Sequence, residues 1–338
     1  MTAIGIVGTG TYFPPTVQTA AEVAALTDIP ASILQEKMGI RQRHIAGDGD
    51  SVSQMASHAA ARAIESAGIP PERIKAVISH GSEYKDHIVW NAAGKIQHNV
   101  GAVNAFAFEM YALCAGAPIA MQAARGMMLA DESLDYVLLS AASRENDLVH
   151  PRNERARFMF NFGAGAGAMV LKRGAERNLI LGASAITDGS LSETVMLTRE
   201  PDALGERDPI NGDVYGMLDV QNAEYMAERL GESSLTNFGR VIGDAVAKSG
   251  ATLDDVAFLG ITHMKRSFYL QILQSVGLQP EQSVYLQDYG HVQSVDQVLA
   301  LELGLAQGKI KDGDLIVLAG AGTGYTWSAV AVRWGAAR

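Results

Sequence analysis

Strand-like and helix-like patterns alternate along the chain. A short run of mostly apolar residues at 136–140 predicts a buried strand. Apolar residues at helical spacing predict helices over 53–67 and 223–248, the second with a break near Gly231 and Leu235. Alternation of the two kinds of element predicts an α/β protein with largely buried sheets.

The same succession of elements occurs twice. Three pairs of segments repeat: strands 75–79 and 257–262, strands 135–141 and 314–320, and the Gly-rich stretches 163–167 and 320–324. The offset between partners is about 180 residues for the two pairs of strands and somewhat shorter for the Gly-rich stretches, as two copies of one unit with loops of different length would give. Duplication predicts a pseudo-twofold arrangement in which equivalent strand ends meet near one centre.

Composition narrows the class of protein. The chain has 338 residues, of which 48% are hydrophobic and 19% charged, which is typical of globular proteins. The net charge of −10 argues against a nucleic-acid binder. We find no apolar run long enough for a membrane span and no signal-peptide pattern at the start. We therefore expect a cytoplasmic protein that acts on neither membranes nor nucleic acids.

Cys114, the single cysteine, is the first candidate for chemistry. One cysteine excludes an intramolecular disulfide and any CxxC metal site. A strand-like segment at 104–108 precedes it and a helix is predicted over 117–130, with Pro118 in the first turn. A helix N-terminus stabilises negative charge, so the sulfur is placed to react as a thiolate. Local context alone leaves open a buried structural cysteine.

A nucleophilic cysteine requires a base or a charged partner. His263 ends the predicted strand 257–262, at the place where His80 follows the equivalent strand in the first half. His291 comes just before a helix predicted over 295–306. Both His263 and His291 lie in the half opposite Cys114, which makes them the candidate partners.

The glycine clusters have different interpretations. Gly5–Gly10 looks like a dinucleotide fingerprint, but Pro14 and Pro15 follow where the required helix would begin. We therefore expect no dinucleotide site there. Residues 163–167 are predicted to form a tight turn between strands. Residues 320–324 precede another strand, and their backbone N–H groups could face an oxyanion.

Several motifs along nearly the whole chain resemble one family. They are GTGTYFP at 8–14, GIRQRHIA at 39–46, LCAG at 113–116, FGAGAGA at 162–168 and GTGYTW at 322–327. In this order and spacing they resemble the thiolase superfamily, specifically β-ketoacyl-acyl carrier protein synthase III-like enzymes. The resemblance implies a duplicated five-layered α-β-α-β-α sandwich and a homodimer. We expect the two halves at residues 1–175 and 176–338.

The resemblance also implies a mechanism. Cys114 would take an acyl group from acyl-CoA or an acyl carrier protein and pass it to an acceptor by Claisen-type condensation. His263 matches the family's first active-site histidine. The N–H groups of Cys114 and Gly324 would form the oxyanion hole. We expect no permanently bound cofactor and no metal.

Two departures from the family pattern leave the acceptor open. His291 stands where the family usually has asparagine. Because imidazole can also act as a base, ester or amide formation by a Cys-His-His site competes with condensation. Lys265 and Arg266 follow His263 and could contact phosphopantetheine or a carrier protein, or form a solvated basic turn. A catalytically inert partner subunit is a third alternative.

Overall fold

The computed structural model describes residues 2–197 and 217–336, and nine strands in this part form one sheet. Its first five strands, in spatial order, are β1 (Ile4–Tyr12), β7 (Gly165–Arg173), β6 (Tyr136–Ser143), β4 (Ala76–Ser79) and β5 (Phe106–Glu109). The other four, also in spatial order, are β8 (Arg177–Thr187), β13 (Thr326–Ala336), β12 (Leu315–Gly322) and β11 (Val256–Ile261). The two sets join through a single pair between β1 and β8, Gly5 with Leu179.

The helices and short strands surround this sheet. The helices are α1 (Ala20–Leu26), α2 (Ala31–Glu36), α3 (Val52–Ala67), α4 (Ala92–Asn99), α5 (Gly116–Ala130), α6 (Ala223–Ala247), α7 (Arg266–Ser275) and α8 (Asp296–Ala306). Two small ribbons pair β2 (Val17–Thr19) with β3 (Gln42–His44) and β9 (Val195–Leu197) with β10 (Leu218–Val220). Among the described residues, no helix is long and apolar enough to span a membrane.

Strand pairing confirms the predicted duplication. In the first set β1, β7 and β6 are antiparallel neighbours, and β6, β4 and β5 are parallel. In the second set β8, β13 and β12 are antiparallel and β12 and β11 are parallel. The place of β5 is taken by one isolated parallel bridge between Leu259 and Ser283. Each copy therefore repeats the same topology.

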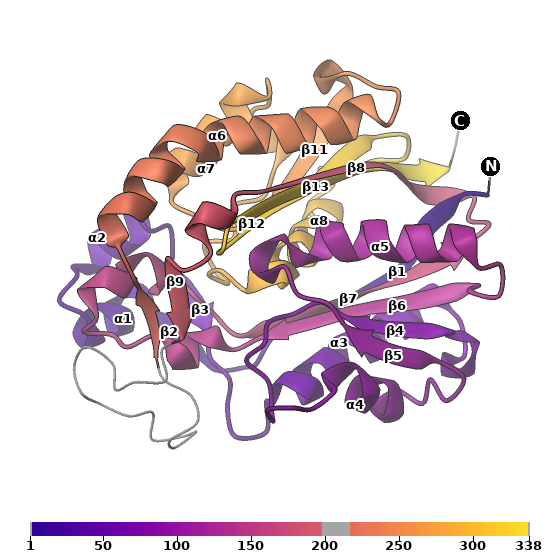
Figure 1. The fold of residues 1–338 in the computed structure, drawn as a ribbon, viewed down its shortest axis with the longest axis horizontal. Helices are drawn as coiled ribbons and strands as arrows, with labels where there is room; N and C mark the ends of the chain where they lie inside the picture. The colour runs from indigo at the N-terminus through magenta and orange to yellow at the C-terminus, as the bar shows by residue number, and fades with distance from the viewer. Residues whose placement is uncertain (1, 198–216, 337–338) are drawn as a thin grey trace.

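The two sets of strands face each other across a layer of helices (Figure 1). Helices α5 and α8 lie between them, α3 and α4 cover one outer face, and α6 and α7 cover the other. The central apolar cluster joins residues of α5 and α8 to both sets of strands. This is the duplicated five-layered α-β-α-β-α sandwich that the sequence predicted. It brings the N-terminal ends of α5 and α8 toward the middle of the molecule.

Glycines on two equivalent strands allow the outer helices to pack closely. A Cβ on Gly8 of β1 would stand 2.2 Å from the Ala63 carbonyl oxygen in α3. A Cβ on Gly182 of β8 would stand 2.2 Å from the Ala245 carbonyl oxygen in α6. The glycine cluster near the N-terminus therefore serves helix packing on an antiparallel strand, in agreement with the rejection of a dinucleotide site.

Two predictions about local structure were wrong. Helix α6 runs without a break from Ala223 to Ala247. A glycine inside a helix costs about 1 kcal/mol relative to alanine, and burial of Phe238 and its apolar neighbours outweighs that cost. The stretch 163–167 is not a turn between strands, because β7 already begins at Gly165.

The proposed boundary between residues 175 and 176 falls in the short connection between β7 and β8. Each copy of the repeat lies on one side of this connection. The division into two halves remains a proposal, since the two copies share the central helix layer.

Candidate active site

Cys114 lies at the sharp turn between β5 and α5. Leu113 has a φ of +48°, which few non-glycine residues adopt, and a short 3₁₀ turn over Leu113–Ala115 leads directly into α5. Gly116 allows this turn to approach the strand end, because a Cβ there would stand 2.6 Å from the His80 carbonyl oxygen. The predicted strand-to-helix placement of Cys114 is confirmed.

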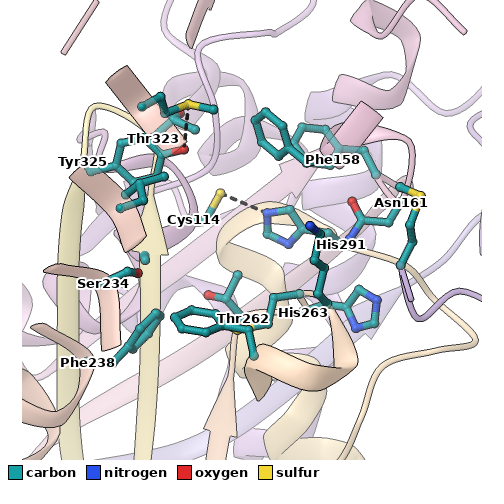
Figure 2. A pocket seen from close by; sticks show the side chains of 18 of the residues that line it. Cys114, Phe158, Asn161, Ser234, Phe238, Thr262, His263, His291, Thr323 and Tyr325 are labelled. Atoms are coloured by element: carbon teal, nitrogen blue, oxygen red, sulfur yellow. Dashed lines mark hydrogen bonds between the residues drawn. The ribbon is translucent and has the colours of Figure 1, made fainter. Parts of the chain in front are cut away.

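His291 stands beside the sulfur, as Figure 2 shows. Its Nε2 is 3.0 Å from Cys114 Sγ, and its Nδ1 is 2.6 Å from Asp296 Oδ2. The backbone of His291 is held on both sides, because its N–H donates to the Asn161 carbonyl and its carbonyl accepts from the Gly163 N–H. The ring therefore has a fixed position between a sulfur and a carboxylate.

Asp296, the first residue of α8, is the partner that the sequence did not reveal. Its side chain is fully buried. Besides His291, its carboxylate accepts hydrogen bonds from the backbone N–H of His263 at 2.7 Å and of Val292 at 2.8 Å. One carboxylate thus holds the segments of both candidate histidines. An acidic residue five positions after a histidine, at a predicted helix start, was the available signal.

These contacts determine the charge of His291. Burial opposes a charged imidazolium, but Cys114 and Asp296 outweigh burial and raise the pKa of His291 well above its ordinary value of 6.5. The arrangement therefore favours the protonated form of His291, which Asp296 orients with Nε2 toward the sulfur. The same geometry defines the catalytic triads of cysteine and serine enzymes.

His263 has the opposite character. Neither of its ring nitrogens has a hydrogen-bond partner of good geometry among the residues that the structure describes, although the Gly39 backbone lies close enough to act against the lowering of the pKa. Burial lowers the pKa of His263 to about 4, although the Asp296 carboxylate acts in the other direction. The Tyr285 ring packs against the imidazole at a centroid distance of 4.8 Å. His263 is therefore neutral at pH 7 and has ring nitrogens available to a bound molecule.

Cys114, His263 and His291 line one cavity of about 430 Å³, a size typical of small-molecule sites. In Figure 2 Cys114 lies in its middle, with Phe158 and Asn161 on one side and Ser234 and Phe238 on another. The wall is mostly apolar; its apolar residues include Met38, Phe162, Met226, Leu230, Phe268 and Tyr325. No cluster of His, Cys, Asp or Glu that could hold a metal ion occurs among the described residues.

The backbone of Cys114 is anchored from the opposite half. Gln297 Nε2 lies 3.1 Å from the Cys114 carbonyl oxygen and 2.9 Å from Thr262 Oγ1. Gly322, at the end of β12, packs on the same turn, and a Cβ there would stand 3.0 Å from the Cys114 nitrogen. Glycine at position 322 keeps this face of the Cys114 amide open.

The other predicted site residues lie further out. Gly324 has a φ of +110°, while its neighbours Thr323 and Tyr325 line the cavity. Lys265 lines the cavity with an exposed side chain. The Arg266 guanidinium lies 5.5 Å from the centre of the Tyr285 ring. Roles for Gly324, Lys265 and Arg266 remain predictions.

Comparisons with known proteins identify the family. The family described as 3-oxoacyl-[acyl-carrier-protein (ACP)] synthase III matches residues 108–189, and its C-terminal counterpart matches residues 246–334. The β-ketoacyl-[acyl-carrier-protein] synthase III of Rhodobacter capsulatus is 30% identical over 339 residues, covering 97% of this chain and 98% of that relative. The chain belongs to the β-ketoacyl-acyl carrier protein synthase III family.

Further relatives agree with this assignment. The β-ketoacyl-[acyl-carrier-protein] synthase III of Rhizorhabdus wittichii is 28% identical over 332 residues, covering 97% of this chain and 98% of the relative. The crystal structure of 3-oxoacyl-(acyl carrier protein) synthase III from Pseudomonas aeruginosa PAO1 superposes with a TM-score of 0.83 at 26% identity, covering 98% of each chain. The protein is thus a ketoacyl-synthase-III-like enzyme with a thiolase-like fold, and therefore a transferase.

Proposed function

We propose that this synthase III-like enzyme transfers an acyl group from acyl-CoA or an acyl carrier protein, through Cys114, to a thioester acceptor by Claisen-type condensation. The observation that carries the proposal is the 3.0 Å approach of His291 Nε2 to Cys114 Sγ in a largely apolar cavity. The apolar wall suits an acyl chain, and the sulfur at its centre suits covalent catalysis.

The first half-reaction loads Cys114. The thiolate attacks the carbonyl carbon of the donor thioester, so that a new C–S bond forms and the C=O electrons move to oxygen. Collapse of this intermediate breaks the donor C–S bond, and the departing thiolate takes the proton from His291. The Cys114 and Gly324 N–H groups are the proposed oxyanion donors, and one such donor contributes about 10²–10³ in rate.

The second half-reaction requires a carbon nucleophile. Loss of CO₂ from a malonyl-type thioester would leave an enolate, whose carbon attacks the acyl group on Cys114 and expels the thiolate. No described residue makes a well-formed hydrogen bond to the ring nitrogens of the neutral His263, so it can donate a hydrogen bond to the enolate oxygen. In this scheme His291 returns to the thiolate-paired state when the product leaves.

One observation favours a second candidate, ester or amide formation. His291 donates from Nδ1 to Asp296 at 2.6 Å, a pairing that orients an imidazole as a general base. With an acyl group on the sulfur, Nε2 is free to remove the proton of an alcohol or amine acceptor as it attacks. No carboxylate would be lost from the acceptor in that case.

The proposal includes where and with which partners the enzyme works. Acyl-CoA or an acyl carrier protein would approach the cavity past Lys265, whose charge suits a phosphopantetheine phosphate. A buried free thiol that must stay reduced suits the cytoplasm.

We also propose a homodimer formed along the free edge of β5. Strand β5 is the outermost strand of the sheet in the part of the chain that the structure describes, and several large apolar side chains near it are exposed: Ile88, Val89, Val103, Phe106 and Tyr111. An unpaired strand edge beside an apolar patch is suited to pairing with a second copy. Light scattering of Phe106→Asp is expected to show a monomer where the unmodified chain shows a dimer.

Intact-protein mass spectrometry tests the first half-reaction. After incubation with panels of acyl-CoA and acyl-carrier donors, the protein is expected to gain one acyl mass. Cys114→Ala is the matched control and should gain none. No adduct from any donor in the panel would reject the enzymatic proposal and favour an inert partner subunit.

Release of CO₂ separates the two candidate acceptors. The acylated enzyme is mixed with a malonyl thioester labelled in its free carboxyl group. Condensation predicts one labelled CO₂ for each acyl group transferred. Turnover with alcohols or amines and no CO₂ from the malonyl thioester would replace condensation with ester or amide formation.

A further inference from the structure

Cys114 has a second polar neighbour besides His291. The side-chain amide of Gln293 places an atom 2.7 Å from Sγ. Gln293 is 5% exposed and lies in the turn that begins α8. It is not among the described residues that line the cavity, whereas Cys114 and His291 are. Gln293 therefore reaches the sulfur from within the protein.

The backbone at Gln293 is unusual for a side chain of this size. Its φ is +55°, a region that glycine and asparagine enter most easily. This conformation directs the side chain onto the sulfur of the opposite half. A residue that only filled space would not require an amide there, because a buried polar group must also find a hydrogen-bond partner.

The amide can present either of two atoms to the sulfur. In the structure, Oε1 faces Sγ and accepts a hydrogen bond from a neutral thiol. Half a turn about the last side-chain bond would place Nε2 there, and the amide has nearly the same shape both ways. An oxygen at this distance would repel a thiolate, whereas an N–H group would donate a hydrogen bond to it. Gln293 can therefore match either protonation state of the sulfur.

We propose that Gln293 is a catalytic residue that stabilises the Cys114 thiolate by donating a hydrogen bond from its side-chain amide, together with His291. The donor acts before loading, when the thiolate attacks, and again when the acyl group departs and the sulfur regains its negative charge. The inference rests on the proposed role of Cys114 as nucleophile. It adds a second donor that is neutral at every pH.

Alkylation by iodoacetamide tests this proposal without any acyl substrate. Because Cys114 is the single cysteine, its rate of alkylation reports this sulfur alone. We expect Gln293→Met, which keeps the length but loses the donor, to shift the low-pH midpoint of the alkylation profile upward by about one pH unit. Gln293→Glu is expected to shift it further in the same direction, since a carboxylate repels the thiolate.

Ser294→Ala is the matched control in the same turn, because Ser294 Oγ donates to the His80 carbonyl at 2.9 Å, while the hydrogen bonds of Sγ within the described part of the chain go to Gln293 and His291. Its profile is expected to match that of the unmodified protein. Gln293→Met and Gln293→Glu profiles that also match would overturn the proposal. If Gln293→Met does not fold, Gln293→Glu decides alone. Because alkylation needs no thioester, it can be measured even if the mass-spectrometric test shows no acyl loading. The two proposals can therefore fail separately.

Discussion

The turn that carries Cys114 and the turn that carries Ser294 occupy equivalent places in the two copies. Each residue stands two positions before the first residue of a central helix, α5 or α8. The residue before each has a positive φ, +48° at Leu113 and +55° at Gln293. The same backbone conformation thus precedes a cysteine in one copy and a serine in the other.

The surroundings of the two turns differ in one respect that matters for chemistry. Cys114 faces a cavity together with His263 and His291 from the other copy. Ser294 lies 3.2 Å from His80 Nδ1, and both residues are fully buried. Burial lowers the pKa of His80 to about 4, as for His263. The repeated fold therefore places Ser294 beside His80 in one turn and Cys114 beside His291 in the other. Only Cys114 lines the cavity, so only this turn can act on a bound molecule.

The largest expected effect follows from removing the nucleophile. Cys114→Ala should lower acyl transfer by at least about 10⁴-fold, because covalent catalysis is lost while binding remains. The measurement is steady-state turnover with the donor identified by mass spectrometry. Transfer at more than one-tenth of the original rate would show that the cavity works without the sulfur.

Loss of the buried carboxylate is expected to have the next largest effect. Asp296→Asn removes the charge that helps raise the pKa of His291, so the imidazolium form is lost at lower pH. We expect turnover to fall by about 10²–10⁴-fold and alkylation of Cys114 at pH 6 to slow. Circular dichroism checks that the variant folds. An unchanged alkylation rate at pH 6 would mean that Asp296 only supports the backbone of its neighbours.

The dependence of the free energy of unfolding on pH tests the buried pair of Ser294 and His80. His80 has a folded pKa near 4 and an unfolded value of 6.5, so the unfolded chain binds the proton first as the pH falls. Stability is therefore fully present above pH 6.5 and is lost between pH 6.5 and 4, by roughly 3 kcal/mol for this residue. His80→Gln should flatten the dependence of the free energy of unfolding on pH in urea titrations.

His263 is expected to contribute a similar slope, since its folded pKa is also about 4. The two histidines then differ in function only. His80→Gln should retain acyl transfer, because His80 is not among the described residues that line the cavity. A His80→Gln variant that folds but loses acyl transfer would contradict the purely structural role given to His80.

The smallest expected effect is at Ser294. Ser294→Ala removes the hydrogen bond to the His80 carbonyl, and a net loss of about 1 kcal/mol in the free energy of unfolding is expected. Transfer by the folded variant should be unchanged. A large loss of transfer at full stability would show that the two turns communicate through α8.

Periodicity and repetition in the sequence were sufficient for much of this picture. The strand and helix patterns, the offset of about 180 residues and the family motifs led to the duplicated sandwich. They also led to Cys114, His263 and His291, which the structure brings to one cavity. The predicted break in α6 failed because local propensity is weaker than the burial of a long apolar face.

The sequence by itself determined the alternation of elements, the duplication and the identity of the candidate nucleophile, since each depends on local spacing or on a motif. Only the tertiary structure decided that Asp296 binds His291, that Gln293 touches the sulfur, and that Ser294 is closed off with His80. Asp296 and His291 are five residues apart and meet in the turn before α8, whereas the contacts of Gln293 and Ser294 join side chains 179 and 214 residues apart. Such contacts are fixed by how two copies pack around a shared helix layer, which no local pattern encodes.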